Sequence, residues 1–251
     1  MSTSVLRCSF PRKIMAPHRL ARSTHNNPPV ETIRRDLRTL LRNTAQPVAV
    51  VTSLMPEKHI SPDIPHSKYH GATLSSFTSI ALDPHPLVAF SLRIPSRMAT
   101  TLRDAHIDWP SHMVINILSG LQEDIAVAFS RVDLFPHPFE SVPFTLTEEG
   151  LPILSGSLGA LSCKLVASSW PLHDLEVLSG DKKKDLDHVW EGDGVASELF
   201  IAQVTRVEST KGPGETDPLQ SSPLLYYQKG YSTTSPLPLK AGSKLRAEKK
   251  P

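Results

Sequence analysis

Short hydroxyl side chains are concentrated in one predicted strand, residues 73–80. They belong to Thr73, Ser75, Ser76, Thr78 and Ser79. Because these side chains are small, a flat ligand could lie close to the backbone, where peptide N–H groups would donate to its polar edge. The hydroxyls could add hydrogen bonds to a phosphate or a sugar-like chain. An ordinary strand with its hydroxyls facing water has the same composition, so this strand alone leaves both interpretations open.

A second candidate follows at Pro95, Ser96 and Arg97, where a helix is predicted to begin. The start of a helix offers unpaired N–H groups and the positive end of the helix dipole, and both attract an anion. Arg97 could add a bidentate pair to a phosphate. Alternatively, Ser96 only caps the helix and Arg97 is solvated. Both candidates fall within residues 70–101, which favours a binding site for a planar ligand that carries a phosphate.

The elements that would position these residues are mainly strands. Apolar and β-branched runs predict strands at 48–54, 73–80, 87–92, 113–118, 160–167, 198–207 and 224–228, with a further candidate at 172–178. Prolines place a loop at 55–68. Strands and helices do not alternate regularly, so the pattern disfavours a doubly wound parallel sheet. It indicates a mainly β, antiparallel barrel with a few flanking helices.

Helices are predicted at three places. The first, 31–43, has apolar residues on one face and arginines elsewhere, and the second covers 96–105. A third begins at Ser119 and Gln122, whose spacing is that of a capping box. Its apolar face would comprise Leu121, Ile125, Ala128 and Phe129.

Composition excludes several classes of protein. The formal net charge is +2 over 251 residues and the basic excess lies at the two ends, so no nucleic-acid surface is predicted. Only Cys8 and Cys163 occur, which gives neither a zinc spacing nor a structural disulfide. No apolar run approaches the roughly 18 residues of a membrane span. The histidines between 59 and 85 have no rigid metal-binding spacing.

The two ends differ in character from the middle of the chain. Residues 1–29 are basic and rich in hydroxyls, and no acidic residue precedes Glu31, which is typical of a mitochondrial transit peptide. A matrix location is therefore expected, with a disordered basic arm and a cytoplasmic location as the alternative. Residues 30–232 would form the folded domain, with a charged surface insertion at 180–194. Residues 233–251 are predicted to be a disordered basic tail.

From about Asn43 to Tyr231 the chain resembles the flavin reductase-like proteins, which have an FMN-binding split barrel. No single motif is specific, and the resemblance rests on the order and spacing of several. They are Pro47-Val48-Ala49-Val50-Val51-Thr52, Gly71-Ala72-Thr73, Ser75-Ser76-Phe77-Thr78-Ser79, Leu82-Asp83-Pro84, Pro86-Leu87-Val88, Pro95-Ser96-Arg97, Val114-Ile115-Asn116-Ile117-Leu118-Ser119, Ala128-Phe129-Ser130, Leu161-Ser162-Cys163, Pro223-Leu224-Leu225-Tyr226-Tyr227 and Gly230-Tyr231.

The resemblance implies a Greek-key split β-barrel, a homodimer, and one flavin per subunit near the dimer interface. The flavin would be FMN, with FAD as a possibility, and NADH or NADPH would reduce it by hydride transfer to flavin N5. By the resemblance, the isoalloxazine and ribityl chain would be lined by Thr73, Ser75, Ser76, Phe77 and Thr78. Ser96 and Arg97 would hold the phosphate. Because the cofactor carries this chemistry, no acid–base pair or nucleophile is required.

One departure from the family concerns the nicotinamide. Members often have Gly-Asp-His just before the late strand, whereas this chain has Val195-Ala196-Ser197. Ser197 or the upstream His188 could make the nicotinamide contact instead. The departure keeps open a split barrel that serves as a flavin-binding or assembly protein without turnover. An oxidase of the pyridoxamine-phosphate type, which uses a similar barrel, is a third possibility.

Overall fold

The computed structural model describes residues 28–105, 108–166, 169–181, 196–208 and 217–235. The chain divides into two compact units, residues 1–39 and residues 40–251. Helix α1 (Val30–Arg42) lies mostly in the first unit and confirms the predicted helix. None of its residues is buried, and its apolar side chains Ile33, Leu37 and Leu40 are exposed. No helix in the described ranges is long and apolar enough to cross a membrane.

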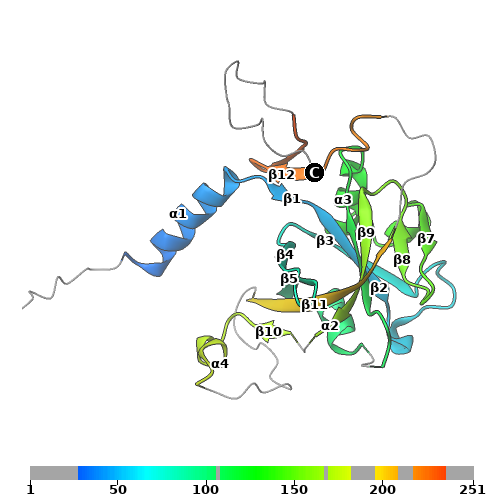
Figure 1. The fold of residues 1–251 in the computed structure, drawn as a ribbon, viewed down its shortest axis with the longest axis horizontal. Helices are drawn as coiled ribbons and strands as arrows, with labels where there is room; N and C mark the ends of the chain where they lie inside the picture. The colour runs from blue at the N-terminus through cyan, green and yellow to red at the C-terminus, as the bar shows by residue number, and fades with distance from the viewer. Residues whose placement is uncertain (1–27, 106–107, 167–168, 182–195, 209–216, 236–251) are drawn as a thin grey trace, which may run out of the picture. The chain divides into compact units, whose positions relative to one another are not determined.

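One curled antiparallel sheet forms most of the second unit (Figure 1). Its strands follow the order β3 (Tyr69–Leu74), β2 (Ala49–Leu54), β6 (Met113–Ile117), β9 (Gly159–Leu165), β11 (Ala196–Glu208), β5 (Leu87–Ile94) and β4 (Thr78–Ala81). A short strand, β10 (Trp170–Pro171), adds to β11. Each of these pairs is antiparallel.

The chain connection between β3 and β4 forces the sheet to curl. These strands stand at opposite ends of the strand order, yet only residues 75–77 separate them. In a flat sheet, six interstrand spacings of about 4.8 Å would place the end strands about 29 Å apart. Four peptide units reach at most about 14 Å. The two ends of the sheet must therefore approach each other, as predicted for an antiparallel barrel.

The prediction of one continuous strand at 73–80 is therefore wrong. Its hydroxyl-rich sequence is divided between the end of β3, the link 75–77 and β4. The link is held to β5 by Ser76, whose Oγ accepts from the Ser91 N–H at 2.9 Å and donates to the Ser91 carbonyl at 3.1 Å. A run of small polar residues is compatible both with one continuous strand and with a break between two strands. The break forms because β4 pairs with β5, whereas β3 pairs with β2.

Smaller elements complete the second unit. A hairpin of β12 (Leu225–Tyr227) and β13 (Gly230–Ser232) pairs with β1 (Gln46–Pro47), and β7 (Phe144–Leu146) pairs with β8 (Pro152–Leu154). The remaining helices are α2 (Arg97–Arg103), α3 (Glu123–Ser130) and α4 (Leu175–Ser179), with 3-10 turns at Glu57–His59 and Pro138–Glu140. Ser96 caps α2 as expected, since its Oγ accepts from the Ala99 N–H at 3.1 Å.

Two further predictions are corrected by the structure. The candidate strand at 172–178 contains α4 instead, because Asp174 Oδ1 accepts from the N–H groups of Glu176 and Val177 and starts a helix there. The helix expected from Ser119 begins later, at Glu123. Gln122 Oε1 does accept from the Ser119 N–H at 2.9 Å, but Leu121 is 47% exposed and lies off the buried face.

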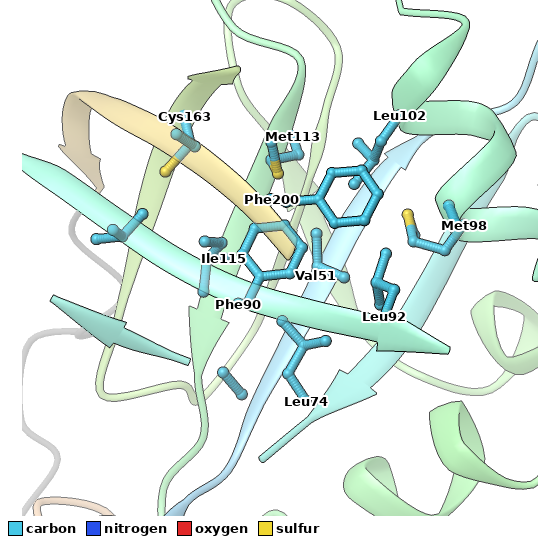
Figure 2. Packing of buried hydrophobic residues seen from close by; sticks show 14 of the residues in the cluster. Val51, Leu74, Phe90, Leu92, Met98, Leu102, Met113, Ile115, Cys163 and Phe200 are labelled. Carbon is cyan, nitrogen blue, oxygen red and sulfur yellow. The ribbon is translucent and has the colours of Figure 1, made fainter. Parts of the chain in front are cut away.

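The main core lies inside the curled sheet. Phe90 of β5 and Phe200 of β11 are register partners, and their rings stack at a centroid distance of 5.5 Å and an angle of 9°. Figure 2 shows this pair at the centre, with Met98 and Leu102 of α2 on one side of it. All four side chains are almost completely buried. Helix α2 thus closes the core and, in doing so, fixes the position of Ser96 and Arg97 at its start.

A buried amide connects three strands of the sheet. Asn116 Nδ2 donates to the Val50 carbonyl and to Thr52 Oγ1, each at 3.2 Å, and its Oδ1 accepts from the Leu154 N–H at 2.8 Å. Asn116 is fully buried. Its side chain therefore holds β8 against β2 and β6.

We expect Asn116→Ala to lower the free energy of unfolding by about 2 kcal/mol, because it leaves the Leu154 N–H buried without an acceptor. Chemical denaturation of the two proteins would measure the difference. Asn43→Ala, which alters an exposed amide, is the control and should change little. Equal stability of Asn116→Ala and the parent protein would contradict this role.

Candidate functional site

A cavity of about 740 Å³ lies in the second unit, and it is larger than the cavity of about 200 Å³ beside it. The larger cavity lies between β3, the link 75–77, β5, the start of α2, the end of α3 and the β12–β13 hairpin. Its polar lining comprises His70, Thr73, Ser75, Ser76, Ser91, Arg93, Ser96, Arg97, Ser130, Ser197, Tyr226 and Tyr231. The strand change after β3 therefore forms one side of this cavity.

The structure brings together most of the predicted site residues. Those that line the cavity are Thr73, Ser75, Ser76, Ser96, Arg97 and Ser197. Phe77 and Thr78 do not: Phe77 packs against the main core, and Thr78 is exposed on β4. Phe77 ends the link 75–77 and Thr78 begins β4, and the change of direction in this link turns both away from the cavity. His188 lies outside the described residues.

Several of the predicted hydroxyls already have partners within the protein. Thr73 Oγ1 donates to the Ala126 carbonyl at 2.7 Å, and Ser76 is bonded to the backbone of Ser91. Ser96 Oγ caps α2. Ser75 is exposed and makes no side-chain hydrogen bond within the described ranges. These hydroxyls therefore mainly fix the shape of the cavity, and Ser75 remains available to a ligand.

Two arginines give the cavity a positive charge. Arg93 and Arg97 are exposed, and within the described part of the chain neither guanidinium has an ion-pair partner. By contrast, Arg103 pairs with Glu198 at 3.2 Å, and Arg206 pairs with Glu149 at 2.7 Å. Two guanidinium groups facing one cavity without carboxylates are suited to an anionic group such as phosphate.

Sequence reasoning missed Ser91, Arg93, Ser130, Tyr226 and Tyr231 as lining residues. A usable signal existed for β5, because Ser91 and Arg93 alternate with the buried Leu92 and Ile94 and must share the opposite face. No local signal marks the two tyrosines as site residues. They belong to the β12–β13 hairpin, more than 120 residues after β5 in the sequence. Their rings are packed edge to face with centroids 5.6 Å apart. Burial raises the pKa of Tyr231.

His70 is neutral in this site at pH 7. Burial, and then the charge of Arg97, lower the pKa of its imidazole to about 4 from an ordinary value of 6.5. His70 is one of the histidines between 59 and 85 whose spacing in the sequence is not that of a metal site. In the described residues no group of three or more His, Cys, Asp or Glu side chains could hold a metal ion.

We expect the ligand-free protein to lose stability as pH falls from about 6.5 toward 4. Across this window the unfolded chain binds a proton at His70 and the folded protein does not, so acid favours unfolding. The loss should be on the order of 2 kcal/mol near about pH 4.5. Denaturant titrations at several pH values would measure it. His70→Gln should flatten the profile and the exposed-site control His85→Gln should not; an unchanged slope in His70→Gln would contradict the assignment.

Comparison with known proteins bears on what this cavity holds. Residues 41–235 match the flavin reductase like domain. The chain belongs to this family. An NADH-dependent flavin reductase from a Rhodococcus species is 32% identical over 158 residues, which cover 63% of this chain and 77% of that protein. The predicted resemblance to the flavin reductase-like proteins is thereby confirmed.

Solved structures agree on the fold. A flavin reductase domain protein from an Arthrobacter species superimposes with a TM-score of 0.58 at 18% identity, covering 83% of this chain and 99% of that one. The styrene monooxygenase flavin reductase from Pseudomonas putida gives a TM-score of 0.54 at 26% identity, covering 81% and 99%. The predicted mainly β, antiparallel split barrel is confirmed.

The residues present fit a flavin phosphate. The cavity falls within the roughly 300–1,000 Å³ that small-molecule sites usually occupy. Residues 71–76, apart from Leu74, have short side chains along one side of the cavity. Arg93 and Arg97, which have no ion-pair partner among the described residues, supply charge for a phosphate. The site thus offers a polar edge for a ring and positive charge for an anion.

Proposed function

We propose that this protein is an NAD(P)H-dependent flavin reductase that holds FMN in the larger cavity. Membership of the flavin reductase-like family supports the reaction class. The assignment to this cavity depends on two guanidiniums beside the strand change at 75–77, those of Arg93 and Arg97, which have no ion-pair partner in the part of the chain that the structure describes. The phosphate of FMN would be neutralised at that point.

Each group of residues has a definable task in this proposal. Arg97 would pair with the phosphate, and the Ser96 hydroxyl could donate to it while still capping α2. The backbone of 73–76, with Ser75, would hydrogen-bond the ring system and its chain. When bound, the flavin supplies the hydride acceptor, so the protein has to bind, orient and exclude water.

Cys163 does not act as a nucleophile in the proposed function. Cys163 is fully buried in the main core and does not line the cavity. Burial raises the pKa of its thiol to about 12, so the thiolate is not formed near pH 7.

Ser197 is our candidate for the nicotinamide contact. It lines the cavity from β11, where it is the register partner of Arg93 on β5. Its hydroxyl could bond the carboxamide of the nicotinamide in place of the histidine that other family members carry. His188, the alternative, stays a prediction.

We also propose that the protein is a homodimer and that it is directed to mitochondria. The exposed apolar face of α1 supports a homodimer, since such faces are usually covered. The acid-free, basic composition of residues 1–29 supports the location. Light scattering of the purified protein and a fluorescent fusion of residues 1–29 would test these two proposals separately.

The reductase activity is tested by adding FMN and then NADH or NADPH under anaerobic conditions. We expect the flavin absorbance band to shift on binding and to bleach on addition of the reductant. Binding without bleaching by either nucleotide would contradict the reductase and leave a flavin-binding protein. Absence of flavin binding would contradict the assignment of the cavity as well.

A further inference from the structure

His70 lies beside the position proposed for the flavin phosphate. It lines the larger cavity together with Ser96 and Arg97 at the start of α2. Its side chain leaves β3 on the same face as that of Leu74, because side chains alternate along a strand. Leu74 belongs to the main core, as does Met98 of α2. The imidazole is therefore on the side of β3 that faces α2, where the charge of Arg97 acts on it.

The imidazole of His70 has polar atoms that the fold does not use. Neither ring nitrogen makes a hydrogen bond or an ion pair with the residues that the structure describes. The side chain is only partly exposed, and it lines both the larger cavity and the smaller one beside it. A ligand that fills the larger cavity can therefore contact this ring.

Positive charge dominates around His70. The titratable and charged groups that share the cavities with it are Arg93, Arg97, Tyr226 and Tyr231 in the larger one, and His59, His66, Arg97, His137 and Glu140 in the smaller one. Among the described residues, no carboxylate lines the larger cavity, and the side chain of Glu140 in the smaller one is exposed. A proton on His70 would add to the charge of Arg97. An anion in the larger cavity would offset both.

We propose that His70 is a second, proton-linked anchor for the flavin phosphate: its imidazole takes up one proton from solvent when the phosphate binds at Arg97, and the imidazolium donates a hydrogen bond to a phosphate oxygen. The proposal rests on the proposed function, since it requires FMN in the larger cavity. It adds a binding residue to that site and couples flavin binding to pH.

The physical basis of this coupling is the change in charge beside the ring. In the ligand-free protein, burial and then the charge of Arg97 lower the pKa of His70 to about 4. A phosphate dianion would offset the guanidinium and raise this pKa, because an opposite charge favours the protonated ring. Below the raised pKa the complex holds one proton more than the free protein, so FMN should bind more tightly as the pH falls.

The phosphate group of FMN has a proton linkage of its own, with the opposite sign. Its second pKa is about 6, so binding as the dianion releases a proton in acid solution. This release is the same in any variant that still binds the dianion. The contribution of His70 is therefore obtained as the difference between the parent protein and a variant without the imidazole.

The test measures proton uptake directly, by calorimetric titration of FMN in buffers of different ionisation enthalpy at the same pH. It compares the parent with His70→Asn, which keeps a polar side chain and loses the titration. His59→Asn, which lines only the smaller cavity, is the matched control. Riboflavin, which lacks the phosphate, is titrated into each protein, and flavin fluorescence gives the dissociation constants from pH 8 to pH 6.

We expect the parent and His59→Asn to take up roughly half a proton or more per FMN, relative to His70→Asn, near pH 7. Riboflavin should cause no uptake. The dissociation constant of FMN in His70→Asn should be close to that of the parent at about pH 8 and about tenfold higher at about pH 6. Histidine imidazole resonances of the parent, which need no variant, should show one pKa that rises with FMN and not with riboflavin.

Equal proton uptake in the parent and His70→Asn would overturn the proposal. So would a loss of FMN affinity in His70→Asn that is the same at every pH, because that loss would come from an altered cavity shape. If His70→Asn does not fold, the imidazole resonances decide, and no pKa that rises with FMN contradicts the coupling.

These results differ from a failure of the reductase proposal. A flavin band that NADH and NADPH do not bleach would contradict the reductase, whereas proton uptake is measured without a reductant and would be unaffected. Absence of FMN binding to the parent would contradict both proposals. FMN binding without any contribution from His70 would contradict only this one.

Discussion

Replacing Arg97 by methionine is expected to weaken FMN binding about a hundredfold and to leave riboflavin binding nearly unchanged. Arg97 lines the larger cavity and has no ion-pair partner among the described residues, so its guanidinium is available for the phosphate. A charge-assisted hydrogen bond contributes about 1.5–3 kcal/mol, and the upper part of that range corresponds to two decades in affinity. Riboflavin has the ring but no phosphate, so it reports on the ring site alone.

Fluorescence titration of both flavins into the parent and Arg97→Met proteins measures this difference. Arg38→Met, which removes an exposed arginine of α1 that does not line the cavity, is the charge-matched control and should bind FMN normally. If Arg97→Met lost FMN and riboflavin affinity to the same extent, the phosphate would not lie at Arg97. Arg93 would then be the next arginine to replace.

Gly71→Ala is expected to reduce the free energy of unfolding by about 3 kcal/mol and to disturb both cavities. A methyl group at Gly71 would lie 2.5 Å from two atoms of the Phe129 ring, far inside contact distance. Phe129 cannot easily move, because it is 3% exposed and its ring meets Phe139 edge to face at 5.0 Å. Gly71 and Phe129 line both cavities, so the displaced ring would change the binding site as well as the core.

Thermal and chemical denaturation, followed by FMN titration of the folded fraction, would measure these two effects. The matched control is Gly159→Ala in β9, where an added methyl group meets nothing within 4 Å. That variant should be as stable as the parent or slightly more so, since alanine loses less backbone entropy than glycine on folding. A Gly71→Ala protein of normal stability would show that the β3–α3 contact can relax.

Much of the local structure could be predicted from the sequence. The β-branched run at 49–54 and the mainly apolar run at 87–92 form strands because most of their side chains are buried. Ser96 caps α2 because a serine there accepts from a helix N–H. The same local chemistry predicted Ser96 and Arg97 at a helix start, and both line the cavity there. These features depend on residues that are close together in the chain.

The strand boundaries around the site depended on distant partners. Residues 73–80 have the composition of one strand, but β3 pairs with β2 whereas β4 pairs with β5, and the chain changes strand between them. That change turned Phe77 and Thr78 away from the site. For 172–178, a capping aspartate and a glycine with a φ of 84° gave a helix where apolar residues suggested a strand.

The sequence by itself determined the hydroxyl-rich segment, the arginine at a helix start and the resemblance to flavin reductases. Only the tertiary structure decided which residues share the cavity. It added Arg93 from the outward face of β5 and Tyr226 and Tyr231 from the last hairpin, and it joined a second cavity at Arg97. The physical reason is that a cavity forms where a curled sheet brings its two ends together, and that closure depends on strand pairing between residues far apart in the chain.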